Sequence, residues 1–115
     1  MSWGQRRSNK YNASSCTYNK ILYASKKEAG YAAELDLRLK AGDIKDWERQ
    51  FKISFDGPGG HICNHYVDFK IEHNNGSFEL VEIKGWPTPE WRLKRNMIDA
   101  LFLPEHPDWR YTVIF

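Results

Sequence analysis

The stretch at residues 66–85 constrains the fold of this chain most. It contains two segments rich in Val, Ile, Phe and Leu, and an Asn-Asn-Gly sequence separates them. Two strand-like segments around such a turn signal predict a β-hairpin. Three charged residues, Asp68, Glu82 and Lys84, lie in or directly beside these apolar segments.

The length of the hairpin loop decides which of these charges face each other. A two-residue loop places Asp68 opposite Ile83. A three-residue loop, built as a type I turn with Gly76 in the left-handed conformation, places Asp68 opposite Glu82 instead. We expect the three-residue loop because it gives the hairpin one uniformly apolar face, formed by Val67, Phe69, Ile71, Val81 and Ile83.

Directly opposed residues of an antiparallel pair have Cβ atoms roughly 4.5–5.5 Å apart, so Asp68 and Glu82 would repel each other. A hard divalent cation relieves that repulsion, and Mg²⁺ takes one or two carboxylates together with waters and phosphate oxygens. Lys84 shares the same face and can stabilise charge on a phosphoryl oxygen. The hairpin therefore indicates a metal-dependent phosphodiesterase site, although an ordinary cross-strand ion pair on a solvated face also fits it.

The composition suits a single globular domain. The chain has 115 residues, of which 41% are hydrophobic, and this is enough for one core. No apolar run approaches the ~20 residues of a membrane span, and no signal peptide is visible. Two cysteines are too few for a disulfide scaffold. We therefore expect a cytoplasmic protein without a membrane partner.

The N-terminal residues 1–16 are polar and basic, and we expect a flexible arm followed by one domain at residues 17–115. The arm is either a plain tail or, through Arg6 and Arg7, a contact to phosphates. The net charge of +2 does not by itself indicate a nucleic-acid partner. A short apolar run at 21–23 predicts a small strand.

The clearest helix begins after Ser25, because Ser at the N-cap and Glu28 three residues later form a capping box. It should end near Ala41, with Gly42 as the stop. Glu28 lies on the same stripe as the apolar residues of this helix, which is unusual for a carboxylate. Either capping alone or a role in the site explains its position. The apolar members of the stripe are Tyr31, Ala32, Leu35 and Leu39.

Between this helix and the hairpin, the sequence predicts a strand at 51–55 and a Gly/Pro-rich turn at 56–60. His61, Cys63 and His65 then alternate along the chain. We do not expect them to bind zinc, because no fourth ligand accompanies them and alternate strand positions are far apart for ligands of one ion.

A second helix should begin after Thr88, with Pro89 at its first position. We expect its buried stripe to contain Leu93, Met97, Ala100 and Leu101. Its cations either form a solvated face or contact a phosphodiester backbone. A last strand follows at 109–115. The order helix, three strands, helix, strand predicts an α/β fold with a mixed sheet flanked by helices.

This order of elements and residues resembles the PD-(D/E)XK nuclease superfamily, which has a restriction-endonuclease-like αβββαβ core. The shared pattern is a helix-borne Glu28, then Asp68 on a strand, then Glu82-x-Lys84 on the next strand. Val67 stands where the superfamily often has Pro. The chain is more closely similar, over roughly residues 9–115, to small phage and prophage proteins of this type. It shares with them Ser-Lys-Lys-Glu-Ala at 25–29, Lys-Ala-Gly-x-Ile at 40–44, Asp-Phe at 68–69, Glu-x-Lys-Gly at 82–85 and Leu-Lys-Arg at 93–95.

The resemblance implies roles for individual residues. Asp68, Glu82 and the carbonyl of Ile83 would hold Mg²⁺ or Mn²⁺. Lys84 would act on the attacking water, and Glu28 would complete the acidic set. The residues expected to contact the DNA backbone are Arg6, Arg7, Lys26, Lys27, Arg92, Lys94 and Arg95.

The expected activity is that of a Mg²⁺-dependent endodeoxyribonuclease. Because 115 residues leave little room for a base-reading module, we expect structure-selective cutting of branched DNA. Holliday junctions in phage recombination are one such substrate, because the superfamily also includes phage resolvases of branched DNA, which resemble this chain in size and in the helix-borne Glu. Cutting two strands symmetrically implies a homodimer. The alternative is a catalytically silent DNA-binding module that keeps the nuclease fold, and RNA as substrate remains open.

Overall fold

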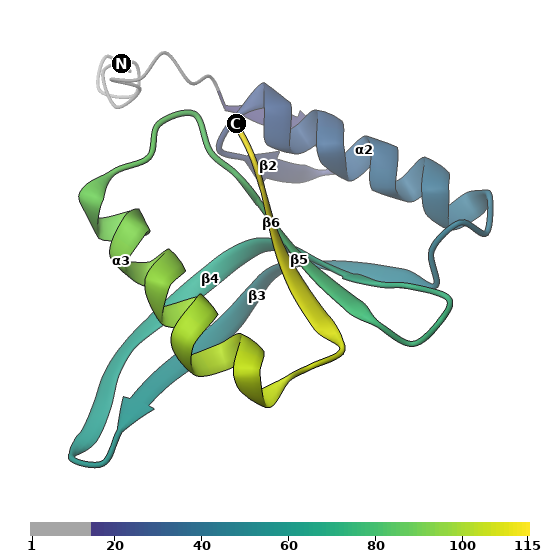
Figure 1. Ribbon diagram of the computed structural model, residues 1–115. Coiled ribbons are helices and arrows are strands. Elements are labelled where there is room, and N and C mark those ends of the chain that lie inside the picture. The colour runs from purple at the N-terminus through teal and green to yellow at the C-terminus, as the bar shows by residue number, and fades with distance from the viewer. Residues whose placement is uncertain (1–14) are drawn as a thin grey trace, which may run out of the picture.

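The computed structural model describes residues 15–115 (Figure 1). Arg6, Arg7 and most of the expected N-terminal arm lie outside these residues. The described part begins with a small antiparallel hairpin of β1 (Cys16–Tyr18) and β2 (Ile21–Tyr23). The predicted strand at 21–23 is therefore confirmed, and it leads directly into the first helix.

That helix, α2 (Lys26–Lys40), begins and ends as expected. The backbone N–H of Glu28 donates a hydrogen bond to Oγ of Ser25 at 3.1 Å, which satisfies one free amide of the first turn. Gly42 follows the helix with a φ of +80°, the left-handed conformation of a helix stop. The expected stripe packs inward, with Ala32 and Leu35 buried and Tyr31 and Leu39 partly buried.

The main sheet has four strands in the order β3-β4-β5-β6. Their bounds are β3 (Asp46–Gly57), β4 (Gly60–Glu72), β5 (Phe78–Ile83) and β6 (Trp109–Ile114). The first three strands pair antiparallel, whereas β5 and β6 pair parallel. A helical connection joins β5 to β6, namely α3 (Pro89–Met97), a π-helical turn (Ile98–Phe102) and a 3₁₀ turn (Leu103–Glu105). The mixed sheet of an α/β fold is thus confirmed.

Two separate apolar clusters cover the two faces of this sheet, and Figure 1 shows α2 and α3 on different sides of it. The α2 cluster consists of the buried residues Tyr23, Ala29, Ala32, Leu35, Ile44, Phe69, Ile71, Val81 and Ile83. The α3 cluster consists of the buried residues Ile53, Phe55, Val67, Leu80 and Ile98. Because both faces are covered, four successive residues of β5, from Leu80 to Ile83, are buried.

The hairpin loop has the expected three residues. The pairing of Glu72 with Phe78 continues to His73 and Ser77, where the backbone N–H of His73 donates to the carbonyl of Ser77 at 2.8 Å. Gly76 has a φ of +89°, which is the left-handed position of the predicted turn. The predicted register is therefore confirmed, and it directs Asp68 toward Glu82.

The prediction of one continuous apolar face, however, is wrong at Val67. Phe69 packs in the α2 cluster, whereas Val67 packs in the α3 cluster. Its partner strand changes face at the same level, because Arg49 lies over the Tyr23 ring and Phe51 packs against the α3 cluster. Gln50, between them, has a φ of +56°, and this left-handed residue breaks the strict alternation of a regular strand.

The expected buried stripe of the second helix is also wrong. Leu93 is 60% exposed and Leu101 is 48% exposed, and Ala100 is exposed as well. The helix instead buries Trp91 and Ile98, with Met97 partly buried beside them. The large indole ring anchors the first turn, and the π-helical turn that follows Met97 shifts the later positions away from a regular 3.6-residue period.

In residues 15–115 no helix is both long enough and apolar enough to cross a membrane. Cys16 and Cys63 are both free thiols. His61 and His65 lie in different surroundings: His61 contacts Asp56 on the exposed β3–β4 hairpin, while His65 is buried further along β4.

We predict that Gly76→Ala lowers the free energy of unfolding by about 1–2 kcal/mol. An added Cβ at Gly76 would meet no atom within 4 Å, so the cost comes from the left-handed backbone alone. Gly59→Ala is the control, because that turn glycine also has open space and lacks a positive φ. Equal stability of the two variants in urea denaturation would contradict the prediction.

Candidate active site

The site begins where the ladder between β4 and β5 stops. The last regular pair is Phe69 with Val81. At the next position, the backbone N–H of Ile83 donates to Oδ2 of Asp68 at 2.8 Å. A side-chain carboxylate thus replaces a backbone carbonyl as the acceptor, which fixes Asp68 in the gap where the two strands separate.

Glu82 carries a carboxylate that is held inside the protein. The residue is only 2% exposed. Nε2 of His65 and the hydroxyl of Tyr111 both donate to Oε1 of Glu82, the latter at 3.1 Å. The indole N–H of Trp91 donates in turn to the Tyr111 oxygen at 3.2 Å. A chain of hydrogen bonds therefore links α3, β6, β5 and β4 through one carboxylate oxygen.

Glu28 approaches this region from the first turn of α2. Burial raises the pKa of its carboxyl group, and the negative charge of Glu82 raises it further. The positive charges of Arg49 and Lys84 act in the opposite direction. The stripe position of Glu28 therefore brings its carboxyl group within electrostatic reach of the hairpin charges.

Asp68 is the most strongly perturbed acid of the group. Burial raises its pKa from 3.8 to about 7, and the charges of Glu28 and Glu82 add to the increase. The hydrogen bond from Ile83 and the charge of Lys84 oppose it without cancelling it. Three carboxyl groups thus share a partly desolvated space, which is an arrangement that a cation would relieve.

Lys84 leaves β5 at the edge of this space. Its backbone N–H donates to the carbonyl of Ile114 at 2.8 Å, which holds the chain against the end of β6. Its Nζ lies 5.8 Å from the centroid of the Trp91 ring. Lys84 also lines a small cavity of about 120 Å³, together with His65, Thr88, Glu90, Trp91 and Lys94.

The donors available to a metal ion are hard oxygens. Within residues 15–115, no three His, Cys, Asp or Glu side chains are grouped as a ready metal site. Asp68, Glu82 and the backbone carbonyl of Ile83 would offer two carboxylates and one backbone oxygen. Mg²⁺ takes such small sets and completes its shell with water and phosphate oxygens. The residues present therefore fit Mg²⁺ or Mn²⁺ better than a caged structural ion.

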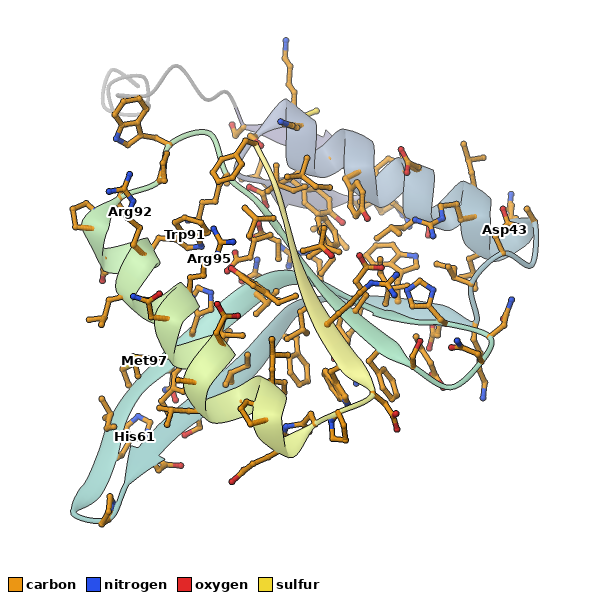
Figure 2. All side chains as sticks on the ribbon, viewed as in Figure 1. Asp43, His61, Trp91, Arg92, Arg95 and Met97 are labelled. Atoms are coloured by element: carbon orange, nitrogen blue, oxygen red, sulfur yellow. The ribbon has the colours of Figure 1, made fainter. Side chains whose placement is uncertain are left out.

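The described cations expected to contact DNA lie on α2 and α3. Lys26 and Lys27 are exposed in the first turn of α2. Arg92 and Arg95 are exposed on α3, and Figure 2 shows them beside Trp91. Lys94 is partly buried, lies 4.0 Å from Glu90, and lines the cavity that contains Lys84.

The sequence did not reveal three residues of this site. Regular alternation along β4 places His65 away from the face of Glu82. The face change at Gln50 and Asp68 brings it to Glu82. Arg49 lies on β3 and Tyr111 on β6, both far in sequence from the hairpin charges that they approach. No local sequence pattern marks either residue.

We predict that Tyr111→Phe destabilises the protein by about 1–3 kcal/mol. The substitution keeps the ring but leaves Glu82 without one donor and the Trp91 indole without its acceptor. Tyr66→Phe is the matched control, because Tyr66 is exposed on β4. Chemical denaturation of both variants measures the difference, and a loss for Tyr66→Phe as large as that for Tyr111→Phe would contradict it.

The raised pKa of Asp68 predicts a pH dependence of stability. Between pH 3.8 and about 7, folded Asp68 keeps a proton that the unfolded chain has released. The folded state binds more protons, so the free energy of unfolding contributed by this residue falls as the pH rises through that window. Asp68→Asn removes the effect, since Asn carries no charge and can still accept from Ile83.

The stability of Asp68→Asn relative to wild type should therefore increase from pH 4 to pH 7 and then level off. Urea denaturation in EDTA measures it. The exposed residue Asp99 provides the control, because Asp99→Asn should track wild type across the same range. A pH-independent difference between Asp68→Asn and wild type would contradict the prediction.

Comparison with known proteins gives one relationship. Neither the curated proteins nor the solved structures contain a match to the chain. A family model described as "Protein of unknown function (DUF1064)" matches residues 8–113, a range that includes Glu28, Asp68, Glu82 and Lys84. The chain therefore belongs to the DUF1064 family.

Proposed function

We propose that this protein is a Mg²⁺-dependent nuclease that hydrolyses phosphodiester bonds in DNA. One observation carries the proposal: Asp68, Glu82 and Lys84 come together where the β4–β5 ladder opens, and Glu28 approaches the same space. Two opposed carboxylates beside a lysine have a clear use in phosphodiester hydrolysis. They are a poor solution for stability alone, because burying like charges costs free energy.

The residues have distinct roles in this proposal. Asp68, Glu82 and the Ile83 carbonyl would hold the metal ion, which supplies charge stabilisation at the phosphoryl oxygens. Lys84 orients the attacking water and stabilises the charge that develops on phosphate. The Trp91 ring lies beside Lys84 and limits where the ammonium group can go. His65 and Tyr111 fix the orientation of the Glu82 carboxylate through its Oε1.

The exposed cations would bind the DNA backbone. Lys94 lies in the same cavity wall as Lys84, so it is placed to contact a phosphate next to the scissile one. Lys26 and Lys27 on α2, with Arg92 and Arg95 on α3, would extend this contact in two directions. Arg6 and Arg7 would add to it from the N-terminal arm.

We further propose that the substrate is branched DNA, such as a Holliday junction in phage recombination, and that the active form is a homodimer. Backbone contacts without a base-reading module favour recognition of DNA shape over sequence. Two symmetric cuts need two sites related by a two-fold axis. A protein that stays monomeric with and without junction DNA would argue against this finer proposal while leaving the nuclease chemistry untouched.

A second candidate function is that of a catalytically silent DNA-binding module. The specific observation in its favour is that Oε1 of Glu82 is already satisfied by His65 and Tyr111 without any metal ion. A purely structural carboxylate would look the same at that atom. Metal binding separates the two candidates, because only the nuclease needs a divalent ion held by Asp68.

The decisive test incubates the protein with circular, linear and four-way-junction DNA in Mg²⁺ or Mn²⁺. We predict cutting that Asp68→Asn and Lys84→Ala each reduce by at least about 100-fold, the size of effect that loss of one charge-stabilising group has in other enzymes. Lys52→Ala is the control, because Lys52 is an exposed cation on β3 away from the site. RNA in a parallel digest shows whether the sugar matters.

Metal binding gives a second readout that does not need turnover. Calorimetry should detect heat from Mn²⁺ in wild type that Asp68→Asn loses and Asp99→Asn keeps. Absence of cutting on every substrate, together with absence of Asp68-dependent heat and equal DNA binding by all variants, would replace the nuclease with the silent binding module.

A further inference from the structure

A second hollow lies beside the candidate active site, on the other side of Trp91. It has a volume of about 430 Å³, within the range of small-molecule sites. It lies between the start of α3 and the residue that follows β6. Its lining residues are Pro87, Trp91, Arg92, Arg95, Asn96 and Phe115.

The walls of this hollow are aromatic. The rings of Trp91 and Phe115 meet edge to face, with centroids 5.9 Å apart and planes at 90°. Trp91 is buried, whereas Phe115 is 61% exposed. The Phe115 ring therefore presents an open apolar surface of the kind on which nucleobases stack, and such stacking does not depend on the identity of the base.

The same hollow is positively charged. Arg92 and Arg95 both line it, and the guanidinium of Arg95 lies 5.6 Å from the centroid of the Trp91 ring. Across the part of the chain that the structure describes, no acidic side chain forms an ion pair with either arginine. Two uncompensated guanidinium groups match the geometry of a phosphate, which accepts bidentate hydrogen bonds from arginine.

Trp91 connects this hollow to the candidate active site. One side of the residue lines the hollow, and the same residue lines the cavity that contains Lys84 and His65. Figure 2 shows Trp91, Arg92 and Arg95 together on α3. A strand whose nucleotide occupies the hollow would thus continue directly toward Lys84.

We infer that this hollow binds one unpaired nucleotide of a DNA strand, with the base on Phe115 and a phosphate on Arg92 and Arg95. A paired base cannot offer its face to Phe115, because its neighbours in the duplex cover it. Nucleotide binding in the hollow does not depend on the proposed function. One consequence does rest on it: the nuclease would prefer to cut a phosphodiester next to an unpaired nucleotide. A free mononucleotide has the same chemistry, so the experiment must separate the two sources.

The test uses a duplex with a single unpaired 2-aminopurine at a branch or overhang, compared with the same duplex fully paired. Binding in EDTA prevents cutting. We expect the protein to bind the unpaired form more tightly and to quench its fluorescence through stacking. Phe115→Ala should reduce the affinity ratio of unpaired to paired DNA by roughly five- to a hundredfold, the factor for loss of one base stack. Arg95→Ala should lower the same ratio, because the phosphate contact in the hollow forms only when the unpaired nucleotide enters it.

Matched controls are Leu37→Ala, which removes an exposed apolar side chain from α2, and Lys40→Ala, which removes an exposed cation. Both should keep the wild-type ratio. An unchanged ratio in Phe115→Ala and Arg95→Ala overturns the inference. A second result would also overturn it: free dAMP competes with the 2-aminopurine quenching, and the protein binds the unpaired and the paired DNA equally tightly.

The result of the 2-aminopurine binding test is independent of the result of the cutting assay. Phe115-dependent quenching without any cutting supports the hollow as a nucleotide site and counts against the nuclease. Cutting that depends on Asp68 but shows no preference for unpaired DNA supports the nuclease and overturns the hollow. Circular dichroism and urea denaturation of Phe115→Ala exclude a loss of folding as the cause.

Discussion

The buried carboxylate of Glu82 is the constraint around which the sheet is arranged. A charged group at 2% exposure is stable only when donors reach it, and two come from different strands of the sheet, β4 and β6. The Tyr111 donor is itself held by Trp91 on α3. The hydrogen bonds to Oε1 of Glu82 therefore depend both on the parallel β5–β6 pair and on the packing of α3 against β6. The polar network and the apolar clusters support each other, since the clusters hold the strands at the spacing that the hydrogen bonds need.

The hairpin register and the first helix were predictable from the sequence because local chemistry decides them. The turn sequence allows a three-residue loop with Gly76 in the left-handed conformation, and the apolar face of Phe69, Ile71, Val81 and Ile83 selects that loop and the register that places Asp68 toward Glu82. Ser25 and Glu28 mark the start of α2 just as directly. These features need no knowledge of the rest of the chain.

Other features depend on contacts between distant residues, and the sequence could not supply them. The left-handed Gln50 reverses the faces of two strands, and Gln is not a residue that signals this conformation. Val67 and His65 consequently lie on the opposite face from the one that alternation predicts. The buried face of α3 was predicted wrongly for a related reason. Trp91 is buried where its indole N–H meets the Tyr111 hydroxyl, whereas Leu93 and Leu101 are exposed, and the number of leucines on a face does not reveal this contact.

The parallel placement of β6 also determines when the site becomes complete during synthesis. Tyr111 lies 29 positions after Glu82 and on the last strand of the described chain. A nascent chain that has already formed the β3–β5 sheet and α3 still has Glu82 without its Tyr111 donor and Lys84 without the Ile114 carbonyl. Contacts of this sequence separation form late because the loop between them must be closed first. The acidic group is thus assembled in its final geometry only after the ribosome has delivered the end of the strand, so a partly made chain carries no finished site.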